Sequence, residues 1–215
     1  MDRSLIEKRS GVDAVAIAAR DAEIKDHEQR VAPLNPQELS DDALNLLNRV
    51  RAGAGAPPAT RADVPGYFLT MAKHPEIFRC QLEMGTAIFK GTLPPREREL
   101  AVLRIGWLLR APFEWGEHVD IAKRYGVRDE EIEWVIIGSA APGWNDDDAA
   151  ILRAVEELLS HQIISDATWA RLASRWSERQ LIEFPMMVGQ YVATALVQNA
   201  LRVDLAADNA GLNQR

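Results

Sequence analysis

Apolar residues recur three and four positions apart along almost the whole chain, and the period-two runs of β-branched residues that mark strands are missing. A sequence with this periodicity buries its apolar faces by packing helix against helix. The chain has 215 residues, 47% of them hydrophobic, which is enough for one core but cramped for two full domains. We therefore predict an all-α protein with one main helical domain.

Prolines, glycines and shifts in composition divide the chain into three parts. Residues 1–30 are rich in alanine and charge and predict an N-terminal helical arm, and the prolines of "APLNP" then interrupt the pattern. Residues 31–205 are expected to form the helical domain, and the polar residues 206–215 a flexible tail. Within the domain we expect helices near 40–51, 65–72, 75–90, 95–110, 112–125, 127–136, 144–159, 165–176 and 177–201, the last with a kink at Pro185.

Charge and cysteine content argue against several classes of function. The chain carries 32 acidic and 25 basic residues, a net charge of −7, and has no lysine or arginine block that would follow a phosphate backbone. We therefore expect no nucleic-acid partner. The single cysteine, Cys80, cannot form an internal disulfide, which favours a reducing compartment, and we expect it to be buried. The only apolar run in residues 1–30, "AVAIAA", is too short for a signal sequence or a membrane span, so we expect a cytoplasmic protein.

The stretch "APFEWGEHVD" places a carboxylate and an imidazole one helical turn apart. Pro112 suits the first position of a helix, which puts Glu114 in the first turn, where the helix dipole favours negative charge. His118 follows four residues later on the same face, so Glu114 can orient its ring and support its cationic form. The same spacing is also common in stabilising ion pairs on solvated helix surfaces. Glu99 favours a functional site, because it lies early in the adjoining helix, just before the apolar run "LAVLRIGWLL". Burying a carboxylate there is costly unless it is paired or used.

The segment "RERELAVLRIGWLLRAPFEWGEHVDIA" resembles the core helical pair of the carboxymuconolactone decarboxylase and alkylhydroperoxidase D superfamily. The phrases "VPGYFLTMAKHPEIF" and "VGQYVATALVQNAL" are similar to the larger single-chain members, and the resemblance covers roughly residues 31–203. It implies an AhpD-like helical bundle, a homo-oligomer (dimer, trimer or hexamer) with pockets between helices, and no metal or organic cofactor. Acidic residues in "NDDDAA" are explained by helix capping, so we expect no metal site there either.

The sequence departs from the peroxidase branch of that superfamily at two positions. The residues matching Ala111 and Glu114 are cysteines in that branch, where they cycle between dithiol and disulfide. Neither is a cysteine here, and Cys80 has no resolving partner nearby, so thiol peroxidase activity is disfavoured. Glu99 and His118 remain, with Glu114 in place of a cysteine, and this set suits acid–base chemistry.

The resemblance implies a small carboxylated substrate derived from aromatic ring cleavage, with His118 as the acid–base group and Glu114 as its orienting partner. Glu99 would be a second proton carrier or an electrostatic partner. Arg104 is the candidate clamp for a substrate carboxylate, although its helical angle relative to Glu99 is unfavourable. Trp115 and Tyr191 are candidates for the pocket wall. The alternative for Trp115 is a place in the core or an interface, and the alternative for Tyr191 is a hydrogen bond from its hydroxyl to a buried partner.

We accordingly expect a cofactor-free lyase or isomerase that uses Glu99, Glu114 and His118 for proton transfer. Two alternatives stay open from the sequence: an alkylhydroperoxidase-like redox or stress protein, and a non-catalytic helical oligomer that binds a small ligand. The position of the Glu114–His118 pair, facing a pocket or facing water, distinguishes them.

Overall fold

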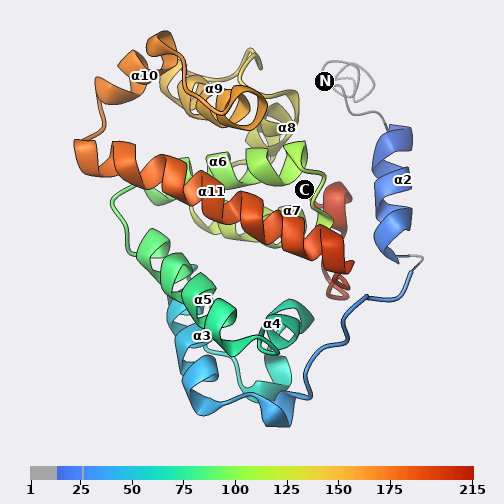
Figure 1. Ribbon diagram of the computed structural model, residues 1–215. Coiled ribbons are helices and arrows are strands. Elements are labelled where there is room, and N and C mark those ends of the chain that lie inside the picture. The colour runs from blue at the N-terminus through green and yellow to red at the C-terminus, as the bar shows by residue number, and fades with distance from the viewer. Residues whose placement is uncertain (1–13, 26) are drawn as a thin grey trace.

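The computed structural model describes residues 14–25 and 27–215, and these contain helices and no strand, as the sequence predicts (Figure 1). Residues 1–13 and 26 of the predicted arm lie outside the described residues. The helices are α2 (Ala14–Lys25), α3 (Asp41–Gly53), α4 (Gly66–Met71), α5 (Pro75–Phe89), α6 (Pro95–Leu108), α7 (Pro112–Arg124), α8 (Asp129–Ile137), α9 (Asp146–His161), α10 (Asp166–Ala173) and α11 (Glu178–Leu201), with short 3₁₀ turns η1 (Pro36–Glu38), η2 (Arg61–Asp63) and η3 (Gly211–Asn213).

The helix starts follow the expected local chemistry. Helices α5, α6 and α7 each begin with a proline at the first helical position, where its missing N–H is not needed. Side-chain oxygens of Ser40, Asn145, Ser165 and Ser177 cap α3, α9, α10 and α11. Helix α11 runs through Pro185 to Leu201 without a break.

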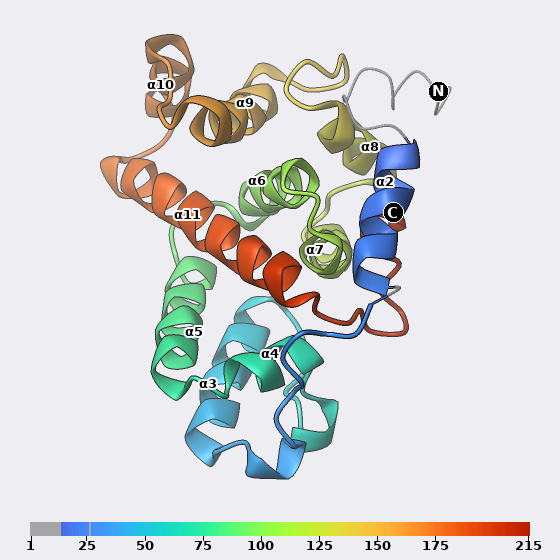
Figure 2. The same cartoon turned by 45° about the vertical axis from the view of Figure 1, so that its right-hand side comes forward.

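Helix α6 is the centre of the fold. Every residue from Arg98 to Trp107 is buried, because α7, α8, α9 and α11 all pack against this helix. Its apolar residues therefore contribute to two core clusters, one shared with α9 and α11 and one shared with α7 and α8. Figures 1 and 2 show α11 crossing the molecule, with α6 to α10 on one side and α3 to α5 on the other.

Helix α2, which belongs to the predicted arm, lies beside the C-terminal segment (Figures 1 and 2). It contacts η3, and the Nε of Arg20 donates a hydrogen bond to the carbonyl of Arg110 at 3.0 Å. None of the helices in the described ranges is long and apolar enough to cross a membrane.

A few buried groups anchor the last ten residues, whereas their polarity predicts a flexible tail. Leu212 is 1% exposed and inserts into the core cluster around α7. The indole N–H of Trp115 donates to the carbonyl of Gln214 at 3.0 Å, and the amide of Asn209 donates to the carbonyl of Phe113 at 3.3 Å. One buried leucine and a few directed hydrogen bonds thus anchor a segment whose average composition is polar.

Gly116 is required for this packing, and its replacement is a first test of the fold. A β-carbon at Gly116 would lie 1.9 Å from the Oδ1 of Asn209, so Gly116→Ala must displace that side chain and its hydrogen bonds. We expect the free energy of unfolding to fall by about 1–3 kcal/mol and proteolysis of the C-terminal segment to accelerate. The matched control is Gly189→Ala in α11, where the new β-carbon meets no described atom within 4 Å and helix propensity should stabilise the protein slightly. Equal effects of the two substitutions in urea unfolding would contradict this account.

Candidate functional site

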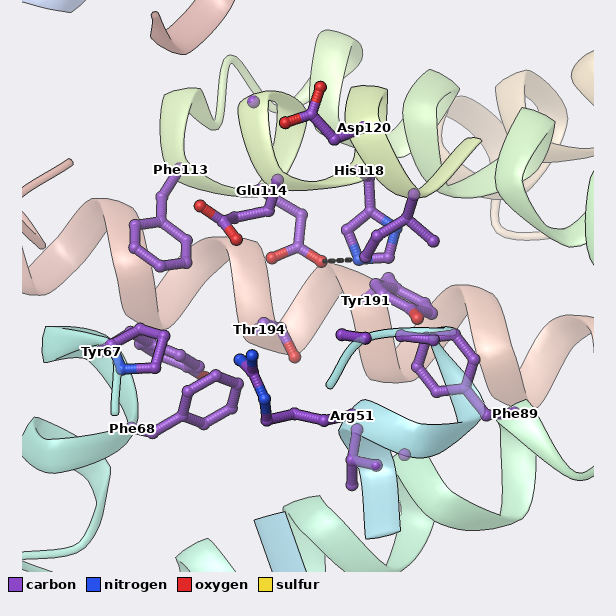
Figure 3. Close-up of a pocket in the computed structure, with 18 of the residues that line it drawn as sticks. Arg51, Tyr67, Phe68, Phe89, Phe113, Glu114, His118, Asp120, Tyr191 and Thr194 are labelled. Carbon is purple, nitrogen blue, oxygen red and sulfur yellow. Dashed lines mark ion pairs between the residues drawn. The ribbon is translucent and has the colours of Figure 1, made fainter. Parts of the chain in front are cut away.

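A cavity of about 380 Å³ lies between α3, α4 and α5 on one side and α7 and α11 on the other. Its size is in the range of small-molecule sites. Four aromatic side chains from α4, α5 and α7 contribute to its walls in addition to Tyr191 of α11: Tyr67, Phe68, Phe89 and Phe113. Glu114, His118 and Tyr191 line the side formed by α7 and α11, and Figure 3 shows them grouped there. The Glu114–His118 pair therefore faces a pocket.

The three residues predicted to be catalytic are joined in one buried chain of polar contacts. The Nδ1 of His118 lies 2.7 Å from the Oε2 of Glu99, and its Nε2 lies 3.3 Å from the Oε1 of Glu114. At one end, the Nε of Arg98 donates to the Oε1 of Glu99 at 2.9 Å. At the other end, the amide of Gln198 donates to the Oε2 of Glu114 at 2.7 Å. Glu99 and Glu114 thus bind opposite nitrogens of one imidazole ring.

This chain holds His118 in its cationic form. Burial by itself lowers the pKa of His118, but the negative charge of Glu99 and the hydrogen bonds to Glu114 and Glu99 outweigh burial and raise the pKa to about 10. At neutral pH both ring nitrogens therefore carry protons, and each donates to a carboxylate. Arg98 and His118 supply two positive charges that balance Glu99 and Glu114, which explains how four charged groups are accommodated in the interior.

The two carboxylates have different surroundings. The side chain of Glu99 is 0% exposed and does not line the cavity, because α6 is covered on all sides by its neighbours. Glu114 lines the cavity from the first turn of α7. Glu99 is thus the closer partner behind the ring, and Glu114 is the carboxylate that a bound molecule can touch. The sequence instead predicts that the role of orienting the His118 ring belongs to Glu114.

Tyr191 packs edge-on against His118, with their ring centroids 5.1 Å apart. Burial and the negative charges of Glu99 and Glu114 raise the pKa of Tyr191 well above its usual value, so the phenol stays protonated. Among the described residues its hydroxyl has no hydrogen-bond partner, and the residue lines the cavity. A protonated phenol beside the imidazolium is therefore available to donate to a ligand.

Arg104 and Trp115 lie away from the cavity. The guanidinium of Arg104 binds Glu156 through Nε at 3.0 Å and the carbonyls of Val135 and Ile136 through Nη1 at 2.8 and 2.9 Å. These bonds tie α6 to α8 and α9, because Arg104 leaves α6 on a different face from Glu99. Trp115 is 0% exposed, packs against Trp107 in the core and does not line the cavity. Neither residue is positioned as the substrate contact that the sequence analysis expected.

Several cavity or cluster residues were missed by the sequence analysis. Arg98 is adjacent to Glu99 in sequence, and a charged residue inside an apolar helix was the available signal for it. Gln198 and Arg51 carry no local motif, since they reach the site only through the packing of α11 and α3. Glu117 also lines the cavity, and burial raises its pKa.

Cys80 is exposed on α5 and is not among the cavity-lining residues, in contrast to the burial expected for it. The reason is its helical position: Phe78 and Leu82, two residues to either side, face the core, so Cys80 points to solvent. Across residues 14–25 and 27–215, no group of three or more His, Cys, Asp or Glu side chains is arranged to hold a metal ion.

Solved structures with the same fold include several proteins of low sequence identity. An uncharacterized peroxidase-related protein from Ralstonia eutropha JMP134, described as an alkylhydroperoxidase AhpD core, has a TM-score of 0.70 at 18% identity, over 85% of this chain and 95% of that chain. The debrominase Bmp8 has a TM-score of 0.67 at 17% identity, over 85% and 95% of the two chains. An uncharacterized peroxidase-related protein from Silicibacter sp. TM1040 has a TM-score of 0.67 at 15% identity, over 87% and 96%.

No protein of curated function matches the sequence. Residues 75–157, however, match the sequence model of the Carboxymuconolactone decarboxylase family. This segment runs from α5 into α9 and contains Glu99, Glu114 and His118. The match places residues 75–157 within the sequence pattern of that family, and the chain shares its fold with the AhpD-like structures.

Proposed function

We propose that this protein is a cofactor-independent lyase or isomerase that transfers protons on a small unsaturated carboxylic acid of the kind released by aromatic ring cleavage. The observation that carries the proposal is the His118 imidazolium, clamped between two carboxylates at the wall of a cavity of about 380 Å³. A clamped imidazolium beside a carboxylate offers an acid and a base within reach of the same bound molecule.

The proposed chemistry passes through an enolate. In an isomerisation, Glu114 removes a proton from a carbon next to the substrate carbonyl, and the electron pair moves onto the carbonyl oxygen. His118 and the hydroxyl of Tyr191 stabilise that oxygen by hydrogen bonds, and the proton returns to a different carbon. In a decarboxylation, the electron pair left by departing CO₂ forms the same enolate, and His118 then protonates its carbon. Both reactions require the same three side chains.

Glu99 and Arg98 act through His118 in this scheme. Glu99 is sealed behind the ring at 2.7 Å and keeps it charged and oriented, while Arg98 keeps a positive charge next to Glu99. These two residues are positioning residues, because a molecule in the cavity does not reach them.

The thiol-dependent alternative has less support. Cys80 is exposed on α5 and does not line the cavity, and the chain contains no second cysteine. A non-catalytic ligand-binding role is compatible with the cavity but does not explain why an imidazolium is held between two carboxylates at its wall. The Glu99–His118 contact is costly to bury, which favours a catalytic role.

A homo-oligomer remains part of the proposal. Helix α11 exposes three large apolar side chains along one face, Ile182 (68%), Met186 (54%) and Leu196 (54%). Such a face is unfavourable in water and suits contact with the same face of a second copy, which makes a two-fold interface.

The proposal is tested by incubating the protein with unsaturated carboxylic acids and their lactones in deuterated buffer and following the products by proton NMR. Deuterium incorporation at carbon, or loss of CO₂, is expected with the unmutated protein and not with His118→Gln. Turnover that survives in His118→Gln but is lost in Cys80→Ser would contradict the proposal and support thiol chemistry instead.

A further inference from the structure

Arg51 places a guanidinium in the cavity on the side opposite His118. It lies in the last turn of α3, and its Nε donates to the carbonyl of Pro57 at 2.9 Å, which fixes the direction of the side chain. In Figure 3 the guanidinium extends into the space near Phe68 and Thr194, across from Glu114. Among the described residues, no carboxylate lies within ion-pair distance of it. The pKa of Asp63 is lowered by hydrogen bonds from Thr60 and, to a smaller extent, by the charge of Arg51. Nη1 and Nη2 are therefore free to bind a ligand.

The remaining charges make the cavity electrically asymmetric. The charges of Arg98, Glu99, His118 and Glu114 cancel within the buried chain, so this group has little net attraction for an additional anion. Three more acidic residues line the cavity from α7 and the C-terminal segment: Glu117, Asp120 and Asp208. Asp120, Asp208 and the other lining arginine, Arg124, are all exposed, so this side of the cavity carries three carboxylates against one guanidinium. An anionic ligand is consequently attracted to the α3 side and repelled from the α7 side.

We propose that Arg51 binds the single carboxylate of a substrate whose flat unsaturated body extends between the aromatic walls towards His118. A guanidinium matches a carboxylate through two parallel hydrogen bonds, which fixes orientation as well as position. A second carboxylate at the far end of the molecule would meet the acidic residues of α7, so the site selects monocarboxylates over dicarboxylates. This inference rests on the proposed function for the direction of binding and narrows its substrate class.

The inference is tested by calorimetric binding measurements with three probes: trans-cinnamate, its neutral amide cinnamamide, and the dicarboxylate trans,trans-muconate. The unmutated protein is expected to bind trans-cinnamate at least about tenfold more tightly than either of the other two. Arg51→Gln should weaken binding of trans-cinnamate by roughly ten- to a hundredfold and leave binding of cinnamamide unchanged. Arg51→Lys keeps the positive charge but loses the paired N–H donors of the guanidinium, so its affinity for trans-cinnamate should lie between those of the unmutated protein and Arg51→Gln. Arg49→Gln, an exposed residue of the same helix, is the matched control and should bind like the unmutated protein.

Unchanged binding of cinnamamide shows that the cavity of Arg51→Gln is intact, so a loss confined to trans-cinnamate cannot come from misfolding. Absence of trans-cinnamate binding to the unmutated protein, equal weakening of both probes by Arg51→Gln, or tighter binding of trans,trans-muconate would each overturn the inference. The proposed reaction is tested separately, because His118→Gln should lose turnover while a carboxylate held by Arg51 still binds. Failure of the Arg51 anchor and failure of proton transfer therefore give different results.

Discussion

Replacing His118 with glutamine is expected to abolish turnover and to weaken the fold at the same time. The substitution removes the proposed proton donor, and general acid–base groups contribute about 10²- to 10⁴-fold to rates. It also removes one of the two cations that balance Glu99 and Glu114, whose side chains are 0% and 5% exposed. Removing one partner of a buried ion pair costs about 3–5 kcal/mol, so one carboxylate must take up a proton or the fold must loosen.

The measurements for His118→Gln are the catalytic rate and the free energy of unfolding in urea, with far-ultraviolet circular dichroism to verify helix content. His161→Gln is the matched control, since that histidine is exposed at the end of α9 and the chemical change is identical. Retention of full activity by His118→Gln would show that the imidazole of His118 is not required for turnover. Retention of full stability would show that the Glu99–His118–Glu114 charges are not coupled to folding.

Replacing Glu99 with glutamine is expected to lower the pKa of His118 and to change how stability depends on pH. The charge of Glu99 is the largest of the effects that raise that pKa to about 10. In unfolded chains histidine has a pKa of about 6.5. The folded value is the higher one, so His118 contributes stability that is fully present below about pH 6.5 and is lost as pH rises through about 10. In Glu99→Gln this loss should be complete at a lower pH, and any alkaline limit of activity should move with it.

The free energy of unfolding of both proteins between about pH 6 and 10.5 measures this effect, because the slope reports proton release from His118. Glu97→Gln is the matched control in the same turn of α6. Glu97 binds Arg175 and Trp176, so its replacement should lower stability by a constant amount without changing the slope. Identical slopes for Glu99→Gln and the unmutated protein would contradict the assignment of Glu99 as the group that keeps His118 charged.

The fold was predictable to the extent that local sequence controls it. Prolines at the first positions of α5, α6 and α7, and the capping side chains before α9, α10 and α11, mark helix starts without reference to distant residues. The C-terminal segment was not predictable from its polarity, because the burial of Leu212 depends on a surface that α7 provides.

The residues of the candidate site likewise fall into those that local sequence predicts and those that only tertiary packing brings together. Glu114 and His118 are one helical turn apart, so their proximity follows from α7 alone, and Glu99 joins them because α6 and α7 are adjacent in sequence and in space. Arg104 and Trp115 were assigned to the pocket from their nearness in sequence, but they leave their helices on other faces. Arg51 and Gln198 reach the site from α3 and α11, and only tertiary packing brings those helices to the cavity.

The most direct test of the central claim is nitrogen-15 NMR of the imidazole rings, with the His118 signals assigned by comparison with His118→Gln. The structure predicts that both ring nitrogens of His118 carry protons at about pH 8, and that the ring titrates near pH 10. A neutral ring at about pH 8, titrating near the ordinary value of about 6.5, would contradict a cation held between Glu99 and Glu114.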